Sequence, residues 1–305
     1  MRGLIIGGSG FIGSHVVDRL LADGMRVRVY DRAEERFRRT PSEVDFRQGD
    51  FTDISSLAEA LVDVDIVFHM LSTSVPSTSN LDPVADIQGN LIGTVRLLEL
   101  MRSADIKRMV YLSSGGTVYG PPKVDFVSET HPEQPISSYG IVKTAIEKYL
   151  LMEAHLFGLN PTILRVSNPY GPRQGHGGVQ GVIGTFLWRI AQEEPIQIWG
   201  DGSIVRDFLY VDDLARLCVD YVKKGIGGTF NVGSGRGASI NDVMGVIEMV
   251  TGLSVQPVYQ PGRGFDVPRL VLDISKIQTQ MGWSPQVSLG DGIERTWEWV
   301  KGQKA

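Results

Sequence analysis

The sequence of 305 residues contains very little cysteine: Cys218 is the only one, so no disulfide can form within the chain. Histidine is also sparse, and no group of Cys and His residues has the spacing of a metal site. We therefore expect no bound metal. The segment around Cys218, DDLARLCVDYV, has helical apolar spacing, so we expect this thiol to be a small side chain on the buried face of a helix.

The sequence also lacks long apolar runs and blocks of basic residues. No apolar run approaches the roughly 18 residues of a membrane-spanning helix, so we expect no contact with a membrane. The first residues lead straight into a strand-like segment, which leaves no room for a signal peptide and favours a cytoplasmic protein. The formal net charge is −5 without a lysine- or arginine-rich block, so we expect no nucleic-acid partner.

What the sequence does contain is a regular alternation of strand-like and helix-like segments through its first half. Strands are expected at 3–6, 26–30, 44–47, 65–69, 108–112 and 161–166, and helices near 11–23, 54–61, 83–103 and 139–157. Such alternation predicts an α/β fold of the Rossmann type, with a doubly wound parallel sheet. The second half has more glycine and proline, and there we expect a smaller C-terminal substrate-binding lobe.

The first loop of this pattern, in GLIIGGSGFIGSH, contains three regularly spaced glycines. Gly7, Gly10 and Gly13 lie between a strand-like and a helix-like segment, and Asp31 ends the next strand, 18 residues after Gly13. Glycines let the backbone approach a pyrophosphate, the helix N-terminus offers free N–H groups, and the carboxylate can accept hydrogen bonds from ribose. A tight turn followed by a surface aspartate is the alternative. The complete strand–turn–helix–strand–Asp context favours a dinucleotide site.

A second candidate for chemistry is the pair Tyr139 and Lys143 in SSYGIVKTAIEKY. The spacing i, i+4 places both side chains on one face of the expected helix. A tyrosine is a poor base at neutral pH, but a neighbouring ammonium group and a nicotinamide ring would favour its phenolate form. Taken alone, such a pair is more often part of an ordinary helix surface.

In their order along the chain, the glycine turn, the serine-rich strand end SSGGTVYG and the YxxxK pair resemble the extended short-chain dehydrogenase/reductase family. The sequence is most similar to the NAD-dependent nucleotide-sugar epimerases of that family, the UDP-galactose 4-epimerase type. Further matching segments extend the resemblance over nearly the whole chain: NLIGT, LRVSNPYGPRQ, VRDFLYVDDLA, FNVGSG and DISKIQTQMGW.

The resemblance implies NAD as the cofactor, since the carboxylate of Asp31 would repel a 2′-phosphate. The implied NAD contacts are Gly7, Gly10, Phe11, Ile12 and Gly13 at the pyrophosphate, Asp31 and Arg32 at the adenosine ribose, Asp50 and Phe51 at the adenine, Met70, Leu71 and Ser72 at the middle of the cofactor, Lys143 at the nicotinamide ribose, and in addition Asn90 and Tyr139.

The resemblance also implies a UDP-sugar substrate. The implied contacts are Ser114 at the sugar, Asn168 and Arg206 at the diphosphate, Arg263 and Asp266 at phosphate and ribose, and Val182, Gln197 and Trp199 around the base. Arginine suits such a site because its planar fork can meet two phosphate oxygens. The alternative is that Arg206 and Arg263 form surface ion pairs with Asp207 and Asp266. We predict an NAD-binding domain at 1–166 with about 207–231, and an interleaved nucleotide-sugar-binding lobe at 167–206 and 232–305.

Two positions depart from the family pattern. In the family, the hydroxyl that bonds the reacting sugar oxygen lies four residues before the tyrosine of VYG, and here that position is Gly115. Either Ser114 or Thr117 would replace it, with Ser114 slightly favoured. The RYFNP segment of the galactose epimerases reads RVSNP here, with Val166 and Ser167 in place of aromatic residues. Both changes concern the identity of the sugar more than the chemistry.

The chemistry implied by the resemblance begins with oxidation of the sugar at C4, with Tyr139 as base and Lys143 lowering its pKa. The related dehydratases have Asp-Glu after the loop hydroxyl, where this chain has Gly116 and Thr117, so dehydration is disfavoured. We predict C4 epimerisation of a UDP-hexose through a transient 4-keto sugar, with UDP-glucose or UDP-galactose ahead of UDP-glucuronate. The alternatives are a decarboxylase, a dehydratase, a 4-keto-sugar reductase or a non-catalytic NAD-sensing protein.

The expected helices 83–103 and 139–157 carry apolar residues on more than one face. In this family such a pair forms a four-helix interface, which implies a homodimer. Packing of both helices in the core of one chain explains the apolar positions equally well. Polysaccharide synthesis is the setting that the resemblance suggests.

Overall fold

The computed structural model describes residues 1–175, 181–262 and 267–303. The chain divides into two compact units: unit 1 is Met1–Gly120, Pro132–Val166 and Ala215–Phe230, and unit 2 is Pro121–His131, Ser167–Leu214 and Asn231–Ala305. Residues 121–131 and 207–214, which we expected in the first domain, thus group with unit 2. For 121–131 the reason is backbone pairing, because the N–H of Val127 donates to Val271 and its carbonyl accepts from Asp273.

A seven-stranded sheet forms the centre of unit 1, in the order β10-β6-β5-β4-β1-β2-β3. Its strands are β1 (Arg2–Ile6), β2 (Arg26–Asp31), β3 (Val44–Gln48), β4 (Ile66–His69), β5 (Arg108–Ser114), β6 (Asn160–Val166) and β10 (Gly228–Val232). The pairings from β3 through β6 are all parallel. The strand order reverses between β1 and β4, and in such sheets the ligand site lies at the carboxyl ends beside this reversal. The Rossmann-type prediction is confirmed, and each of the six expected strands lies within two residues of its predicted ends.

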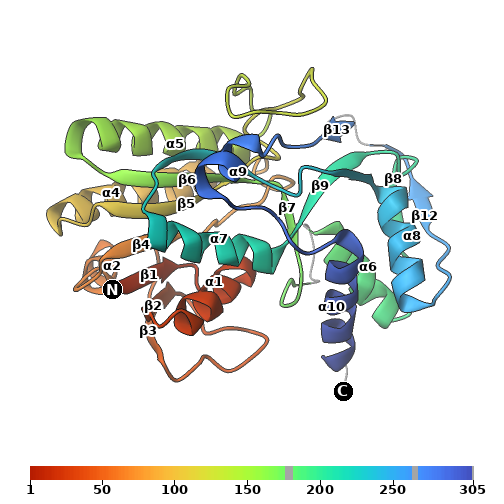
Figure 1. The fold of residues 1–305 in the computed structure, drawn as a ribbon, viewed down its shortest axis with the longest axis horizontal. Helices are drawn as coiled ribbons and strands as arrows, with labels where there is room; N and C mark the ends of the chain where they lie inside the picture. Colours follow the sequence, from red (N-terminus) through yellow and green to blue (C-terminus); the bar gives the residue numbers. More distant parts are fainter. Residues whose placement is uncertain (176–180, 263–266, 304–305) are drawn as a thin grey trace. The chain divides into compact units, whose positions relative to one another are not determined.

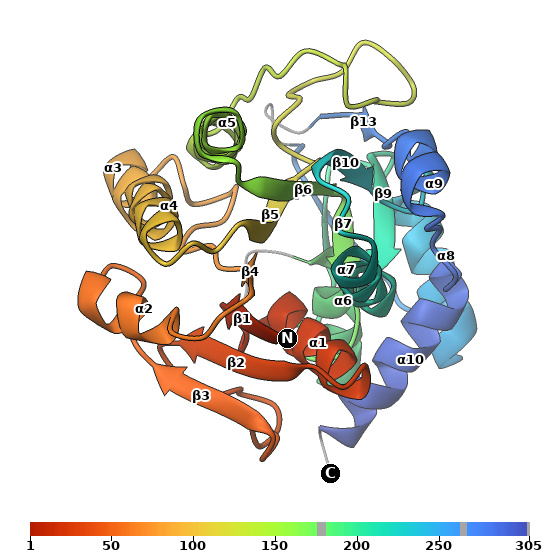
Figure 2. The same ribbon diagram turned by 60° about the vertical axis from the view of Figure 1, so that its left-hand side comes forward.

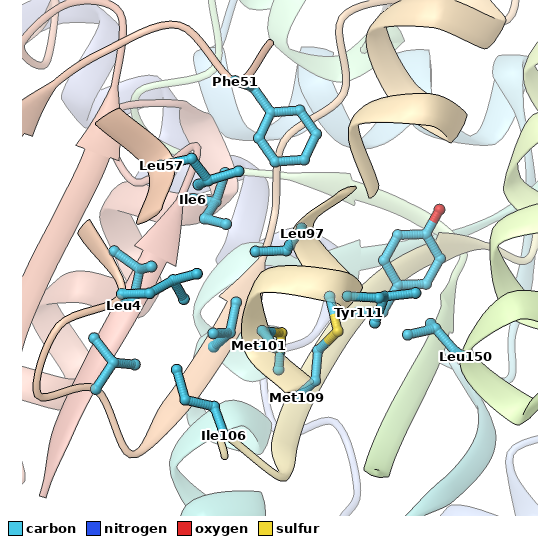
Figure 3. Close-up of a cluster of buried hydrophobic side chains, with 14 of the residues drawn as sticks. Leu4, Ile6, Phe51, Leu57, Leu97, Met101, Ile106, Met109, Tyr111 and Leu150 are labelled. Atoms are coloured by element: carbon cyan, nitrogen blue, oxygen red, sulfur yellow. The ribbon is translucent and has the colours of Figure 1, made fainter. Parts of the chain in front are cut away.

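The strands of this sheet are apolar because both faces are covered. Leu4, Ile5 and Ile6 of β1 are fully buried, as expected for a central parallel strand. On one face, Leu4 and Ile6 join an apolar cluster with residues of three helices, among them Leu57 and Leu97 (Figure 3). This cluster anchors the strand ends that carry the glycine turn and the residues after β4 and β5.

Helices cover both faces of the sheet in unit 1 (Figure 2). One face carries α1 (Phe11–Ala22) and the unit 1 part of α7 (Val211–Lys224), and the other carries α2 (Ile54–Ala60), α4 (Gly93–Ser103) and α5 (Ser138–Phe157). Helix α5 begins after Ser137, whose side chain accepts a hydrogen bond from the N–H of Gly140, and it ends at Gly158 with a φ of 73°. These caps fix the helix that holds Tyr139 and Lys143.

The segment expected as one helix at 83–103 has three parts. It consists of α3 (Pro83–Asp86), a π-helical turn η1 (Ile87–Ile92) and α4. Within the turn, the Asn90 side chain bonds to the backbone N–H of Thr73 and to the Asp86 carboxylate. Single π-helical turns of this kind are frequent at functional sites.

The described part of unit 2 is built from short strands and four helices of its own. The strands are β7 (Asn168–Tyr170), β8 (Gln197–Trp199), β9 (Val205–Tyr210), β11 (Gly237–Ser239), β12 (Val258–Gln260) and β13 (Arg269–Leu270), and the helices are α6 (Val182–Ala191), α8 (Ile240–Thr251), α9 (Ser275–Met281) and α10 (Leu289–Gly302) (Figure 1). Strand β9 pairs with β7, β11 and β13. The buried Trp283, which follows α9, donates a hydrogen bond to the carbonyl of Asp213 at the start of α7.

Cys218 is fully buried on α7, as the sequence predicted. Among the described residues, no helix has the length and apolar character needed to cross a membrane. The same part of the chain contains no group of His, Cys, Asp and Glu side chains suited to hold a metal ion.

Candidate active site

The glycine turn between β1 and α1 leaves no space for side chains. Gly7 has a φ of 82°, and a Cβ there would lie 2.9 Å from the backbone of Leu71. A Cβ on Gly13 would lie only 2.1 Å from the carbonyl oxygen of Gly7. Helix α1 begins after Gly10, which offers no capping side chain, so the first N–H groups of the helix are available to an anion such as a pyrophosphate.

Carboxylates end two neighbouring strands beside this turn. Asp31 ends β2, and its carboxylate accepts hydrogen bonds from the N–H groups of Ser9, 3.1 Å away, and Arg32, 2.8 Å away. These bonds aim the side chain across the glycine turn. Asp50 follows β3, and hydrogen bonds from Thr52 lower the pKa of its carboxyl group.

A pocket of about 430 Å³ joins these residues with the segment after β4. Five predicted cofactor contacts line it: Asp31, Arg32, Asp50, Phe51 and Leu71. The lining also includes residues that the sequence analysis did not name, such as Tyr30, Ser74, Ser79, Asp82 and Asp86. The pocket lies entirely within unit 1.

Tyr139 and Lys143 lie together at the start of α5. The Nζ of Lys143 is 5.5 Å from the ring centre of Tyr139 and 4.9 Å from that of Tyr111. It donates a hydrogen bond of 2.8 Å to the carbonyl of Leu112 in β5. The predicted i, i+4 arrangement therefore exists in the structure, with Lys143 buried and Tyr139 partly buried.

Burial has opposite effects on the two groups because it disfavours the charged form of each. It raises the pKa of Tyr139 to about 12, opposed by a hydrogen bond with the Ser72 side chain. It lowers the pKa of Lys143 to about 8, opposed by the negative charges of Asp86 and Glu147. Desolvation therefore dominates the pKa of Tyr139 in the protein alone, and a pKa-lowering role of Lys143 stays a prediction.

The two candidate hydroxyls of the β5 loop differ in their surroundings. Ser114 is the last residue of β5 and is partly exposed. The Oγ1 of Thr117 is shielded from solvent and has no hydrogen-bond partner among the described residues. The Tyr111 hydroxyl is likewise buried without such a partner, and it lies at the edge of the apolar cluster (Figure 3). Buried polar groups without partners are rare and indicate a place for a bound molecule.

Asp86 is the polar residue that the sequence analysis missed. It is 2 % exposed, although its neighbours Val84 and Ile87 are 62 % and 40 % exposed. Its carboxylate accepts hydrogen bonds from Asn90, Ser74 and Ser138, the residue before Tyr139. The i, i+4 spacing of Asp86 and Asn90 was the available signal, but it is also common on exposed helix faces.

Apart from Ser114 in unit 1, the described residues that we predicted to contact the substrate lie in unit 2. Asn168 of β7 and Arg206 of β9 are on adjacent strands, since Asn168 pairs with Phe208. The Asn168 side chain donates to the carbonyl of Asp207, and the Arg206 guanidinium donates to the carbonyl of Val267.

The remaining substrate predictions fall on other elements. Val182 begins α6. Gln197 and Trp199 share the exposed face of β8, which pairs with β12 in a separate sheet. Arg263 and Asp266 lie outside the described residues.

Comparison with known proteins identifies the family. The model of the NAD-dependent epimerase/dehydratase family matches residues 3–233. The chain belongs to this family. It is 37% identical over 310 residues to the UDP-glucose 4-epimerase of Mycolicibacterium smegmatis, covering 99% of each chain. The UDP-glucose 4-epimerase of Thermotoga maritima, crystallised with UDP-glucose, superimposes with a TM-score of 0.96, 36% identity and full coverage of both chains. The UDP-glucuronic acid 4-epimerase of Bacillus cereus, crystallised with UDP-glucuronic acid and NAD, gives a TM-score of 0.89, 29% identity and 99% coverage of both.

The cofactor of an NAD-dependent epimerase/dehydratase fits the residues of unit 1. The glycine turn forms a cradle that a Cβ on Gly7 or Gly13 would fill. Asp31 presents a carboxylate where ribose hydroxyls can donate to it, and it disfavours a phosphate at that position. The cofactor is therefore NAD, in agreement with the prediction from the sequence.

Proposed function

We propose that this protein is a UDP-hexose 4-epimerase of the UDP-glucose/galactose type. The observation that carries the proposal is the Tyr139–Lys143 pair in the same unit as the dinucleotide pocket, in a chain similar over its whole length to UDP-glucose 4-epimerases. A protein that only senses NAD has no need of a buried tyrosine and lysine at this place.

In this proposal Tyr139 is the base that takes the proton of the sugar C4 hydroxyl and later returns it. NAD held by the glycine turn and Asp31 would supply a hydride acceptor and donor for C4, and the positive charge of its oxidised form would favour the Tyr139 phenolate. The hydrogen bond from Lys143 to the carbonyl of Leu112 fixes the position of its ammonium group beside Tyr139, where it supplies a further positive charge. Lys143 is buried and Tyr139 partly buried, which limits the access of water to the proton transfer.

The hydroxyl that contacts the reacting sugar oxygen comes from Ser114 or Thr117. The solvent-shielded Oγ1 of Thr117, without a partner among the described residues, supports Thr117. Ser114 at the end of β5 remains the residue that the sequence favoured. Single substitutions to alanine distinguish them, because only loss of the active hydroxyl lowers kcat strongly.

UDP-glucuronate is the second candidate substrate, supported by the likeness to the Bacillus cereus enzyme.

Epimerisation is favoured over dehydration because Gly116 and Thr117 supply no carboxylate for the elimination of water. Asn168 and Arg206 are proposed to hold the diphosphate, and Arg206 suits this task through its planar guanidinium.

The experiment incubates the purified protein, without added cofactor, with UDP-glucose, UDP-N-acetylglucosamine and UDP-glucuronate separately, and separates the products by chromatography. We expect a C4 epimer from UDP-glucose that disappears in Tyr139→Phe and persists in Tyr149→Phe, a partly exposed tyrosine on the same helix. Product from UDP-glucuronate alone would select the second candidate. Formation of a 4-keto sugar with matching reduction of added NAD⁺ would indicate a 4-keto-sugar reductase running in reverse.

We also propose a homodimer through α4 and α5, which lie side by side in both views (Figures 1 and 2). Helix α5 exposes Ile141, Leu151, Leu156 and Phe157 to solvent, with Leu156 at 58 %. A run of exposed apolar side chains on one helix is typical of an interface. Light scattering is expected to give the mass of two chains, and Leu156→Asp to shift it toward one. A wild-type mass of one chain would contradict the proposal.

A further inference from the structure

The first turn of α5 is held by side chains from a distant segment. The N–H of Ser138 donates to Asn80 Oδ1 at 2.8 Å, and the N–H of Tyr139 donates to Ser79 Oγ at 3.1 Å. The first N–H groups of a helix have no partner within the helix, so they need partners from elsewhere. Ser79 and Asn80 therefore fix the backbone of Tyr139 itself.

Asp86 adds a second connection to the same turn. Its Oδ2 accepts from Ser138 Oγ at 2.7 Å, while its Oδ1 accepts from Ser74 Oγ at 2.6 Å and Asn90 Nδ2 at 2.8 Å. One buried carboxylate thus joins the segment after β4, the π-helical turn and the start of α5. Hydrogen bonds to a charged acceptor are stronger than those between neutral groups.

The burial pattern of α3 shows that this carboxylate is not a routine surface group. The helix exposes Val84 and buries Asp86, the reverse of the usual amphipathic pattern. Burying a carboxylate is costly unless hydrogen bonds satisfy it. Here three donors do so, and Asp86 and Ser79 also line the pocket assigned to NAD.

We propose that Asp86, Ser79 and Asn80 form a clamp that positions Tyr139 for proton transfer. The inference rests on the proposed function, since it concerns the base of that reaction. All three are positioning residues: they act through the backbone and neighbours of Tyr139. The clamp also gives the segment after β4 a role beyond lining the pocket, because its position sets the position of the base.

Asp86 has an electrostatic effect besides its hydrogen bonds. The ionisable groups that face the Tyr139–Lys143 pair are Asp86 of α3, Tyr111 of β5, Glu147 of α5 and His69 of β4. His69 is neutral, because burial lowers its pKa to about 3. The negative charge of Asp86 raises the pKa of both Tyr139 and Lys143, so its removal lowers both.

The test compares Asp86→Asn with wild type over a range of pH. Asparagine keeps the shape, and the Ser138 hydroxyl can turn to accept from its amide, so the fold is expected to survive. We expect kcat to fall about tenfold or more through misplacement of the base, with KM little changed. Both limbs of the bell-shaped dependence of kcat on pH are expected to move to lower pH. Without the negative charge of Asp86, Tyr139 and Lys143 each lose their protons more easily.

Two further variants separate charge from position. Ser79→Ala removes the acceptor for the Tyr139 N–H without changing charge, so kcat falls while the limbs stay in place. Asp105→Asn is the matched control, because this aspartate is 86 % exposed and pairs with Lys107 at the opposite end of β5. Asparagine tolerates the φ of 54° found at Asp105. The Asp105→Asn variant is expected to match wild type in every measurement.

A second readout needs no substrate. Phenolate formation by Tyr139 in the NAD-loaded protein is followed by ultraviolet absorbance, as the difference between each protein and the same protein carrying Tyr139→Phe. We expect the midpoint to lie at lower pH in Asp86→Asn than in wild type. Unchanged midpoint and unchanged kcat would overturn the clamp. Failure of wild type to epimerise any UDP-sugar would instead refute the proposed function, and the absorbance midpoint alone would then decide the inference.

Discussion

At Gly13, the absence of a single methyl group decides whether the first turn can form. A Cβ there would meet the Gly7 carbonyl at 2.1 Å, a distance that no relaxation of a side chain can relieve. We expect purified Gly13→Ala to retain little NAD and to melt at a lower temperature, because the turn must shift. Bound NAD is measured by enzymatic assay after denaturation. Gly245→Ala on α8, where a Cβ meets nothing within 4 Å, is the control and is expected to retain NAD fully.

Lys143 lowers stability in return for its role at the site. Its pKa is about 8 in the folded protein, against 10.5 for an ordinary lysine. At pH 7 the folded state must therefore hold a disfavoured ammonium group, at a cost of about 3 kcal/mol. Between pH 8 and 10.5 the unfolded chain binds more protons than the folded one, so this cost disappears as the pH rises through that window.

We therefore expect Lys143→Met to be inactive but more stable than wild type at pH 7 when no cofactor is bound. The difference in the free energy of unfolding is expected to shrink as the pH rises from about 8 to 10. Urea denaturation at several pH values measures it. Lys148→Met, on the exposed side of the same helix, is the comparison and is expected to show no such trend. A stability difference for Lys143→Met that grows with pH would contradict this account.

On the scale of elements, a buried ion pair fixes α5 on the sheet. The Arg165 guanidinium of β6 donates to both carboxylate oxygens of Glu147, and Ser113 donates to the same carboxylate. Arg165 also bonds Tyr119. Both partners are almost completely buried, with side-chain exposures of 3% and 1%.

Glu147 is the more deeply buried of two carboxylates that pair with Arg165, the other being that of Glu133. Its loss removes the most shielded ionic partner of a buried guanidinium. Glu147→Gln is expected to lower the free energy of unfolding by about 3 kcal/mol. Glu153, also on α5, pairs with Arg102 of α4, and this pair is more exposed. Glu153→Gln is expected to lower the free energy of unfolding by less than about 1 kcal/mol. Urea denaturation of the two variants makes the comparison. Equal losses would show that burial does not govern these pairs.

The elements of unit 1 were largely predictable from the sequence, and the reason lies in the physics of the parallel sheet. Its strands are buried on both faces, so they are short apolar runs that stand out between helices of a different period. The interruption of the helix at 83–103 was not predictable, because it depends on the contact of Asn90 with Thr73, a residue distant in the sequence. The same holds for the clamp at Tyr139, whose partners lie about 60 positions earlier.

On the scale of the whole molecule, the predicted cofactor residues lie together in one unit, whereas most predicted substrate residues lie in the other. The glycine turn, Asp31 and the Tyr139–Lys143 pair depend on local spacing within consecutive strand–helix units, and the structure places all of them in unit 1. The predicted UDP contacts are spread over loops and short strands of unit 2, where no periodic pattern specifies position. The pKa values of Tyr139 and Lys143 could not be predicted from the sequence either, since they depend on burial that only the folded chain creates.

We propose that the protein removes hydrogen from C4 of a UDP-sugar and returns it to the same carbon. The most direct measurement incubates the purified protein, with no added cofactor, with UDP-glucose carrying deuterium at C4, and analyses the product by mass spectrometry and NMR. The account predicts UDP-galactose with the deuterium still at C4. Loss of the label to solvent, or a 4-keto product formed only as added NAD⁺ is reduced, would contradict the proposal.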